Sequence, residues 1–301
     1  FRAAEESGIK TAAVYSKEDR FAIHRFKTDE SYLVGEGKGP IQAYLDIDSI
    51  IKIAKDAKVD AIHPGYGFLS ESPELAEQCE KNDITFIGPN KEILKRFGNK
   101  TEAKKVAEEA KVGTVPSVLV TKENLKSVEK EVEKIGYPVI VKASWGGGGR
   151  GMRVVRSSSE LIDQITTAQS ESLKAFGKDE VFIEKFLEDA AHIEVQILGD
   201  KHGNIIHLFE RDCSLQRRHQ KIIERAPAHF LENKTREEIC NAAIKIAKQV
   251  KYFGAGTVEF LFDKKSGKFY FIEVNPRIQV EHTVTEAVSY THLRAHETDH
   301  D

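Results

Sequence analysis

Short apolar runs alternate with amphipathic stretches along the first part of the chain, up to about residue 98. Three runs have the length and composition of buried strands: Lys10–Ser16, Val59–His63 and Ile84–Gly88. Two stretches between them carry apolar residues at helical spacing: Ala43–Lys58 and Pro73–Lys81. Strands that alternate with helices are typical of a parallel sheet covered on both faces. Residues 1–98 are therefore predicted to form a doubly wound α/β domain.

After a predicted helix over Lys100–Lys111 the pattern changes, because the strands now come in pairs. The predicted strands are Pro138–Ser144 with Arg153–Arg156, Val181–Leu187 followed by His192–Leu198, Ile205–Arg211, and Gly256–Asp263 with Lys268–Val274. Two predicted helices interrupt them: Ser158–Ala175 and Thr235–Lys251. Hairpins mixed with helices indicate an α+β domain built on antiparallel sheet.

The composition is that of a globular protein and narrows the classes of partner. Apolar residues make up 40 % and charged residues 31 % of the chain, which is enough apolar material for buried cores. Lys and Arg (45) nearly balance Asp and Glu (48), so no broad basic face for nucleic acid is predicted. No apolar run approaches the roughly 20 residues of a membrane helix, so no membrane partner is predicted. Three widely spaced cysteines match no zinc or redox pattern and are interpreted as inert thiols: Cys79, Cys213 and Cys240.

The segment VIVKASWGGGGRGMRVV places a glycine-rich loop between two predicted strands. Glycines let backbone N–H groups approach an anion without interference from a Cβ atom. The segment matches neither the P-loop nor the dinucleotide-binding pattern, so a flap over phosphates is predicted. Lys142 lies on the strand that enters the loop and could place its charge on phosphate oxygens. Lys100, at a helix start, is a second candidate, with a solvated surface position as the alternative.

Two carboxylates face each other in the predicted hairpin GTVEFLFDKKSGKFYFIEVNP. If the register pairs Asp263 with Phe269, Glu259 lies opposite Glu273, and Asn275 shares the face of Glu273. Directly opposed like charges destabilise a sheet, and a divalent cation between them would remove the repulsion. Mg²⁺ prefers carboxylate and carbonyl oxygens completed by water and phosphate. A solvated hairpin edge is the alternative.

The motif NPRIQVEH follows the hairpin directly. If the chain stays extended, Arg277, Gln279 and Glu281 continue the same face. An arginine, an amide and a glutamate beside a metal–phosphate site could bind, orient and deprotonate a small oxyanion. The basic run DCSLQRRHQK, Asp212–Lys221, is either a solvated turn or part of the same cleft.

Four long motifs closely resemble the biotin carboxylase family, ATP-grasp enzymes of biotin-dependent carboxylases: HPGYGFLSES, KASWGGGGRGMR, ERDCSLQRRHQK and FYFIEVNPRIQVEHTVTE. They occur in family order, and the resemblance runs from Phe1 to about Val288. Several stretches look most like pyruvate carboxylases, with acetyl-CoA and propionyl-CoA carboxylases as the alternative. The resemblance implies a biotin carboxylase N-terminal α/β domain over 1–98 and an ATP-grasp domain over 99–288, with a lid at about 117–187.

The resemblance also implies a role for each matching position. ATP would be bound by the phosphate lysines, the lid and the residues around adenine and ribose: Lys100, Lys142, Gly146, Gly147, Gly148, Gly149, Met152, Glu184, Lys185, Leu187, His192, Gln216 and His219. Mg²⁺ or Mn²⁺ would be held by Glu259, Glu273 and Asn275. Bicarbonate would be bound by Lys221 and Arg277, with Glu281 as its general base. Biotin, carried on a separate domain, would approach Tyr66, Gly67, Gln279 and Val280.

The implied reaction is the ATP-dependent carboxylation of biotin. Glu281 would deprotonate bicarbonate, whose oxygen would attack the γ-phosphate of ATP to form carboxyphosphate. Carboxyphosphate would release carbon dioxide and phosphate, the phosphate would take the biotin N1 proton, and Arg277 would stabilise the enolate. Catalysis would thus rest on positioning and electrostatics. The implied partners are a biotinyl carrier domain, a carboxyltransferase domain and further copies of the chain, in a bacterial cytoplasm or a mitochondrial matrix.

The chain departs from the family pattern at both ends. The family's first strand would lie upstream of Phe1, and the rest of its ATP-grasp domain and its C-terminal domain would follow Val288, so an inactive fragment is one expected outcome. Residues 289–301 do not follow the family and are predicted to be a non-native tail. Two other functions remain open: another ATP-grasp ligase, such as a carbamoyl-phosphate synthetase, and a nucleotide-binding module without chemistry.

Overall fold

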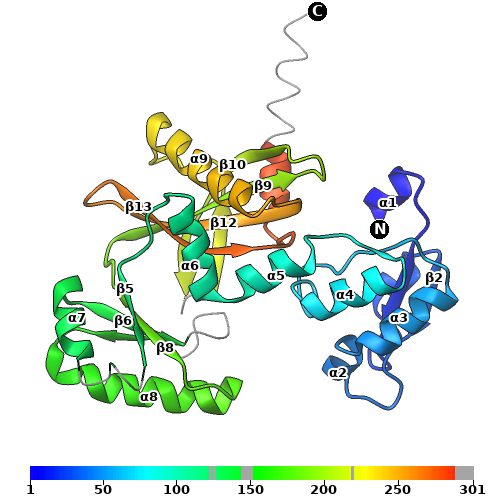
Figure 1. The fold of residues 1–301 in the computed structure, drawn as a ribbon. Helices are drawn as coiled ribbons and strands as arrows, with labels where there is room; N and C mark the ends of the chain where they lie inside the picture. Colours follow the sequence, from blue (N-terminus) through cyan, green and yellow to red (C-terminus); the bar gives the residue numbers. More distant parts are fainter. Residues whose placement is uncertain (122–123, 125–126, 144–151, 218–219, 289–301) are drawn as a thin grey trace, which may run out of the picture. The chain divides into compact units, whose positions relative to one another are not determined.

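The computed structural model describes residues 1–121, 124, 127–143, 152–217 and 220–288 (Figure 1). Three sets of sequence predictions lie outside the described residues: those on Gly146–Gly149, on His219 and on the tail 289–301. The chain divides into two units, Phe1–Lys95 and Arg96–Asp301. Each unit is described by itself.

The N-terminal unit alternates short strands with helices. Its elements are α1 (Arg2–Glu6), β1 (Ala12–Tyr15), η1 (Ile23–Phe26), β2 (Glu30–Leu33), α2 (Pro40–Tyr44), α3 (Ile47–Asp56), β3 (Ala61–Ile62), α4 (Pro73–Lys81) and β4 (Thr85–Phe86), with α5 (Lys91–Gly98) crossing into the second unit. The strands pair in parallel, as predicted, but as two separate two-stranded sheets, β1 with β2 and β3 with β4. The sequence pattern did not predict β2, because its residues, ESYL, form no apolar run.

Helix boundaries in this unit follow local capping chemistry. Asp46 precedes α3 and accepts a hydrogen bond from the Ser49 backbone N–H at 3.3 Å. Ser72 precedes α4 and accepts one from Leu75 at 3.1 Å, with Pro73 in the first turn. The apolar faces of α3 and α4 pack on β3 and β4 in one core, built around Ile51, Ala54, Leu75, Cys79 and Ile84. The caps and the shared core thus determine where α3 and α4 lie against β3 and β4, and so where the loop after β3 begins.

The second unit contains a four-stranded antiparallel sheet. Its elements are β5 (Ser117–Val120), α7 (Val128–Ile135), β6 (Val139–Ala143), β7 (Arg153–Val155), α8 (Ser158–Phe176) and β8 (Val181–Lys185), with the strand order β5-β8-β6-β7. Figure 1 shows α7 and α8 along this sheet. Val139, Val141, Val181 and Ile183 alternate along β6 and β8 and are buried in the core with α7 and α8. The residues that alternate with these four along β6 and β8 therefore lie on the opposite face of the sheet.

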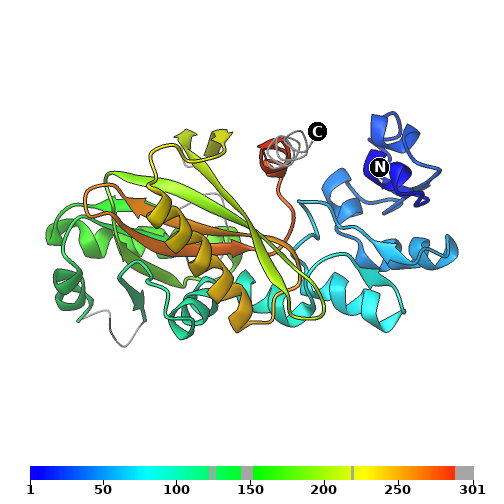
Figure 2. The ribbon, with the colours of Figure 1, turned by 90° about the horizontal axis from the view of Figure 1, so that it is seen from above.

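A larger, five-stranded antiparallel sheet follows. Its elements are β9 (Ala190–Gly199), β10 (Ile205–Arg217), β11 (Gln220–Arg225), β12 (Gly254–Asp263) and β13 (Lys268–Asn275), with α6 (Lys100–Glu109) and α9 (Asn233–Gln249). The strand order is β11-β10-β9-β12-β13. Figure 2 shows α9 lying across this sheet, where it packs on β9 and β10, while α6 packs on β13. None of the helices in the described part of the chain has the length and hydropathy needed to cross a bilayer.

The predicted pairing of consecutive strands is wrong at one place. The sequence pattern groups β8 with β9, but β8 pairs with β5 and β6, and β9 lies in the other sheet. The reason is that the two strands serve different cores. Val181 and Ile183 of β8 fill the core with α7 and α8, whereas Ile193 and Val195 of β9 are buried in the sheet that α9 covers.

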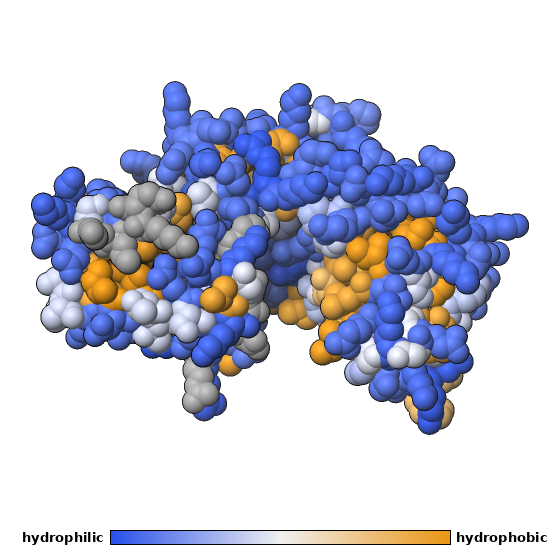
Figure 3. Space-filling model, turned by 60° about the horizontal axis from the view of Figure 1, so that its bottom comes forward, coloured by the Kyte–Doolittle hydropathy of each residue, from blue (hydrophilic) through white to orange (hydrophobic). Residues whose placement is uncertain are grey.

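Apolar side chains remain at the surface of both units, and Figure 3 shows patches of them on one face. Phe21 and Ile23 in the N-terminal unit are each 75 % exposed. Leu215, Ile222 and Ile223 are exposed on β10 and β11. Single exposed apolar residues are ordinary, but contiguous patches mark surfaces that contact other molecules.

Candidate functional site

The β12–β13 hairpin brings two glutamates face to face. Glu259 pairs with Glu273, as predicted, and Thr257 pairs with Asn275. The predicted register at the turn is wrong, because Asp263 pairs with Lys268 and not with Phe269. The register shifts by one residue between Glu259 and Phe260, where β13 contains an extra residue. This β-bulge restores the opposition of the two acids.

A third glutamate and an arginine extend this pair across the sheet. Glu194 on β9 pairs with Glu259 on one side and with Arg211 of β10 on the other. Directly paired residues on neighbouring strands project from the same face of a sheet. Arg211, Glu194, Glu259 and Glu273 therefore form one row across four strands, called here the acid row. Arg211 and Glu194 are fully buried, and Glu259 is nearly so.

Lys221 and His192 contact the middle of the acid row. The Lys221 ammonium, from β11, forms ion pairs with Glu194, with Glu259 Oε1 at 2.9 Å and with Glu281 Oε1 at 3.3 Å. His192 Nε2 lies 2.7 Å from Glu259 Oε2, and Gln216 Nε2 lies 3.1 Å from His192 Nδ1. The structure thus brings together five residues that were predicted to bind different ligands: Lys221, Glu259, Glu281, His192 and Gln216.

The charges of the acid row are unevenly stabilised. Burial alone raises the pKa of the Glu259 carboxyl, but His192 and Lys221 outweigh it and hold that pKa below its ordinary value. Burial and the negative charge of Glu259 raise the pKa of Glu273 above its ordinary value. When two buried carboxylates lie close together, their repulsion makes one of them resist ionisation. The pair therefore has the electrostatics of a cation site.

The atoms that could bind a cation come from three strands. His192, Glu194 and Glu259 each place one ligand atom within 4.8 Å of the others. Asn275 Nδ2 donates to Glu259 Oε1 at 2.8 Å, so the predicted ligand Asn275 also lies at this site. The sequence analysis missed Glu194. Its signal was available, because Glu194 and Gln196 interrupt the apolar strand HIEVQIL at alternate positions.

Arg211 is the second residue that the sequence analysis missed. Its guanidinium donates to five buried side-chain oxygens, at distances from 2.9 to 3.2 Å: those of Gln196, Thr285, Glu194, Thr257 and Gln279. Arg211 thereby ties the acid row to the segment that follows β13. Its neighbour Glu210 pairs with Arg236 of α9 at 2.8 Å, so α9 covers the opposite face of the sheet.

The segment after β13 does not stay extended, so the predicted alternation of residues 277, 279 and 281 is wrong. It turns after Asn275 and enters a helix at His282. Arg277 Nη2 donates to Asn275 Oδ1 at 3.1 Å, and Glu281 is buried beside Lys221. Gln279 is buried against Arg211, whereas Val280 is 64 % exposed. The turn thus brings Arg277 and Glu281 to the acid row by a route that strand periodicity does not describe.

One of the predicted nucleotide residues, Lys100, lines a separate small cavity of the same unit. Its volume is about 60 Å³, and it is lined by Lys100, Thr101, Lys104, Ser117, Leu119 and Phe182. Glu184 on β8 lies beside it and pairs with Lys142 Nζ at 2.5 Å and with Lys104. Lys100 Nζ lies 3.8 Å from Glu273 Oε2 and so connects this cavity with the acid row.

The remaining predicted residues are placed as follows. The Lys185 ammonium donates to the Gly136 and Tyr137 carbonyls, each at 3.0 Å. Met152 and Leu187 are half-buried, before β7 and after β8. Tyr66 and Gly67 belong to the N-terminal unit, in the loop after β3, where Tyr66 is 58 % exposed.

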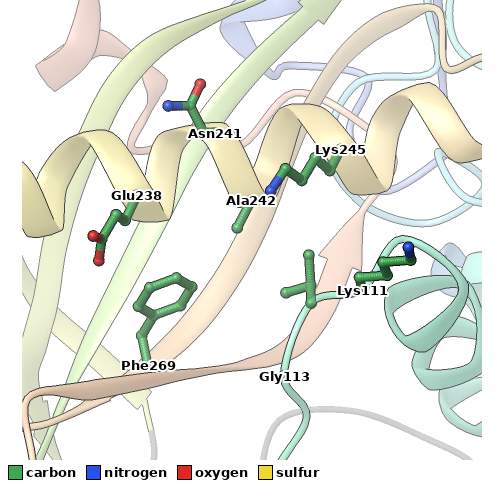
Figure 4. Close-up of a pocket in the computed structure, with 8 residues that line it drawn as sticks. Lys111, Gly113, Glu238, Asn241, Ala242, Lys245 and Phe269 are labelled. Atoms are coloured by element: carbon green, nitrogen blue, oxygen red, sulfur yellow. The ribbon is translucent and has the colours of Figure 1, made fainter.

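A larger pocket of about 340 Å³ lies between α9 and the loop after α6 (Figure 4). It is lined by Lys111, Gly113, Asn241, Lys245 and Phe269, among others. None of the predicted site residues within the described chain lines it. Because α9 covers the face opposite the acid row, this pocket is separate from the candidate site.

Comparison with known protein families defines the class. Residues 99–296, more than half of the chain, match the family described as carbamoyl-phosphate synthase L chain, ATP binding domain. Residues 1–94 match the biotin carboxylase N-terminal domain. The chain therefore belongs to this family of ATP-binding domains and combines it, as biotin carboxylases do, with a biotin carboxylase N-terminal domain. The fold is accordingly an N-terminal α/β domain followed by an ATP-grasp domain.

The chain is similar to the pyruvate carboxylases of several organisms. The chain is 57 % identical to the pyruvate carboxylase of Bacillus subtilis over 289 residues, covering 96 % of this chain and 25 % of the relative. It is 54 % identical to the mitochondrial pyruvate carboxylase of Rattus norvegicus, with 96 % and 24 % covered. The chain thus spans about a quarter of the length of the curated relatives it matches.

Two solved structures are also similar to the chain, one of a pyruvate carboxylase and one of a biotin carboxylase. Rhizobium etli pyruvate carboxylase, solved with the allosteric activator acetyl coenzyme-A, superposes with a TM-score of 0.88 at 56 % identity, covering 96 % of this chain and 26 % of that one. The Campylobacter jejuni biotin carboxylase in complex with an ATP analogue superposes with a TM-score of 0.91 at 46 % identity, covering 95 % and 64 %.

Proposed function

We propose that the chain performs the first half-reaction of a pyruvate carboxylase, the ATP-dependent carboxylation of biotin by bicarbonate. The observation that supports this most directly is the contact of one ammonium, Lys221, with Glu194, Glu259 and Glu281. A nucleotide-binding module without chemistry has no need of a buried carboxylate beside a cationic side chain at the end of its metal site. A bicarbonate-activating enzyme needs this arrangement, because the anion must be held and deprotonated at the same place.

The acid row fits a divalent cation. Glu259 and Glu273 oppose each other, and burial together with the negative charge of Glu259 raises the pKa of Glu273, so a cation between them would stabilise both charges. Mg²⁺ or Mn²⁺ would be held by Glu259, Glu273 and Asn275, and we add Glu194 as a neighbour of that set. When bound, the cation would neutralise charge on the phosphates of ATP.

ATP would lie beside the small cavity between α6 and the four-stranded sheet, because a volume of about 60 Å³ is too small to hold the nucleotide itself. Lys100 and Lys142 would contact the phosphates, and Glu184 with the residues after it would contact adenine. The glycines of the lid, Gly146–Gly149, belong to this proposal but lie outside the described residues. The position of Lys100 supports it, because its ammonium lies between the cavity and Glu273.

Bicarbonate would bind at the end of the acid row. Lys221 and Arg277 would hold the anion, and Glu281 would take its proton. The bicarbonate oxygen would then attack the γ-phosphorus of ATP, breaking the bond to the bridging oxygen and releasing ADP. Carboxyphosphate would divide into carbon dioxide and phosphate, and the phosphate would take the N1 proton of biotin. Arg277 would stabilise the biotin enolate that attacks carbon dioxide.

The partners follow from the relatives, which are about four times longer than this chain. We propose that a biotinyl carrier domain presents biotin to Tyr66, Gly67, Gln279 and Val280, and that a carboxyltransferase domain and further copies of the chain complete the enzyme. Apolar patches such as those in Figure 3 support contacts with further protein. The bacterial and mitochondrial relatives suggest a bacterial cytoplasm or a mitochondrial matrix as the compartment.

Phosphate release from ATP, measured with Mg²⁺ and with or without bicarbonate and free biotin, tests the function. Bicarbonate-dependent release that biotin stimulates is expected for a biotin carboxylase. Release that depends on ammonia instead would indicate a carbamoyl-phosphate-forming ligase of the same family. Glu281→Gln should abolish the bicarbonate-dependent release and leave ATP binding intact. Glu286→Gln is the matched control, because Glu286 lies in the same segment with its side chain 66 % exposed. Equal release in the Glu281 variant and the unaltered chain would refute the base assignment.

A further inference from the structure

The carboxylate of Glu184 is shared by two lysines from different elements. Its Oε2 lies 2.5 Å from Lys142 Nζ of β6, and its Oε1 is paired with Lys104 Nζ of α6. Glu184 is buried, with 5 % of its surface exposed. Each oxygen of one buried carboxylate therefore has its own ammonium.

Sheet register explains how Lys142 reaches Glu184. Phe182 pairs with Lys142 on one side and with Leu119 on the other, and Glu184 pairs with Ser117. These residues share the face opposite the valine-rich core of this sheet. Lys142 is therefore within reach both of Glu184 and of the cavity that this face lines.

Lys104 approaches the same carboxylate from the helix. It lies one turn after Lys100 on α6, whose N-cap Asn99 accepts two backbone hydrogen bonds, so both lysines project from one side of the helix. Its ammonium also donates to Ser117 Oγ at 3.0 Å and lies 5.0 Å from the centre of the Phe182 ring. Only 13 % of its side chain is exposed. Lys104 is thus held beside Glu184 by contacts that do not involve Lys142.

The two lysines face different demands in the proposed function. Lys142 must move its charge toward the phosphates, and this removes one counter-ion from Glu184. A buried carboxylate left without a partner is strongly destabilising. Burial alone raises the pKa of Glu184, and the two lysines together hold it below its ordinary value. The carboxylate therefore depends on keeping at least one of them.

We propose that Lys104 is a positioning residue for nucleotide binding, which neutralises Glu184 so that Lys142 can transfer its charge to the phosphates of ATP. This inference rests on the proposed ATP site and adds a residue to it. The proposal assigns Lys104 no contact with the phosphates or with the reacting atoms. Its effect is exerted through Glu184 and Lys142.

Isothermal titration of the full chain with ATP in the presence of Mg²⁺ tests the inference. Lys104→Met should weaken ATP binding by at least about tenfold, because Lys142 can then leave Glu184 only at the expense of an unpaired buried charge. Lys104→Arg should restore affinity to within about threefold of the unaltered chain, because it keeps the charge. Lys105→Met is the matched control: Lys105 is the next residue, its side chain is 59 % exposed, and it pairs with Glu102.

A double variant separates this role from a merely structural one. In a Glu184→Gln background no buried charge needs a counter-ion, so adding Lys104→Met should cost no further affinity. This pair of variants also applies if Lys104→Met alone does not fold. The inference is overturned if Lys104→Met binds ATP as the unaltered chain does, or if its loss persists in the Glu184→Gln background. Absence of ATP binding by the unaltered chain would instead refute the proposed function on which the inference rests.

Discussion

Replacing Arg211 by methionine should destabilise the second unit more than the replacement of any other single charged residue of the acid row. The guanidinium is fully buried and donates to oxygens of five side chains. Methionine fills a similar volume but removes the positive charge that faces Glu194. The change therefore isolates the electrostatic and hydrogen-bonding contribution of this residue.

The magnitude follows from the partners that would be left. Breaking a buried ion pair by removing one partner costs about 3–5 kcal/mol. Lys221 also contacts Glu194, and this contact lowers the cost. Four further acceptors each lose one donor, and these losses, about 1 kcal/mol each if they were independent, offset that reduction. We therefore expect a loss of about 3–5 kcal/mol. In a unit of this size, 1 kcal/mol lowers Tm by about 2–4 °C, so the expected decrease is roughly 6–20 °C.

Differential scanning calorimetry of the full chain measures this decrease, with Arg225→Met as the control. Arg225 pairs with Asp212 at 2.6 Å, and its own side chain is 52 % exposed. Because the backbone N–H and the hydroxyl of Ser214 also donate to the buried Asp212 carboxylate, Arg225→Met should cost less than Arg211→Met. Thr285→Val, which removes only one acceptor of Arg211, should fall between the two. A decrease for Arg211→Met no larger than that for Arg225→Met would refute the view that Arg211 organises the site.

Three further predictions concern the metal, the pH dependence and the thiols. Mg²⁺ or Mn²⁺ at about 100 times its Kd should stabilise the chain by about 2.7 kcal/mol in thermal denaturation, and equal stabilisation of Glu259→Gln would contradict the assignment. Because the pKa of Glu184 is lowered in the folded chain, its ion pairs should stabilise the fold above its ordinary value of 4.5 and lose that effect as the pH falls through the folded pKa. Tm should thus fall more steeply with acid in the unaltered chain than in Glu184→Gln, and equal slopes would contradict this. Burial raises the pKa of all three thiols, to about 11 for Cys79 and about 12 for Cys240, so none should react rapidly with a disulfide reagent until the chain unfolds.

Local patterns predicted those parts of the fold that local interactions determine. Helix α4 begins and ends where the sequence pattern placed it, because Ser72, Pro73 and the apolar spacing all act within a few residues. The β12–β13 hairpin was predicted for the same reason, since its two strands are joined by a short turn. The bulge was not predicted, because nothing in the alternation of β13 requires an extra residue there. The opposition of Glu259 and Glu273 was therefore correctly predicted from an incorrect register.

Residues contributed by distant strands escaped the sequence analysis, and they alter the charge balance of the site. Glu194 meets Glu259 only because β9 lies between β10 and β12, an order that no local pattern specifies. A third acid alone would leave more negative charge than one divalent cation can neutralise. Arg211 pairs with Glu194 at 3.1 Å, and Lys221 contacts Glu281 at 3.3 Å. With Glu194 paired to Arg211, Glu259 and Glu273 are the two acids of the row left to bind a cation, with Lys221 and Lys100 beside them. The buried arginine thus explains why a row of three glutamates suits the same ion that the hairpin alone predicts.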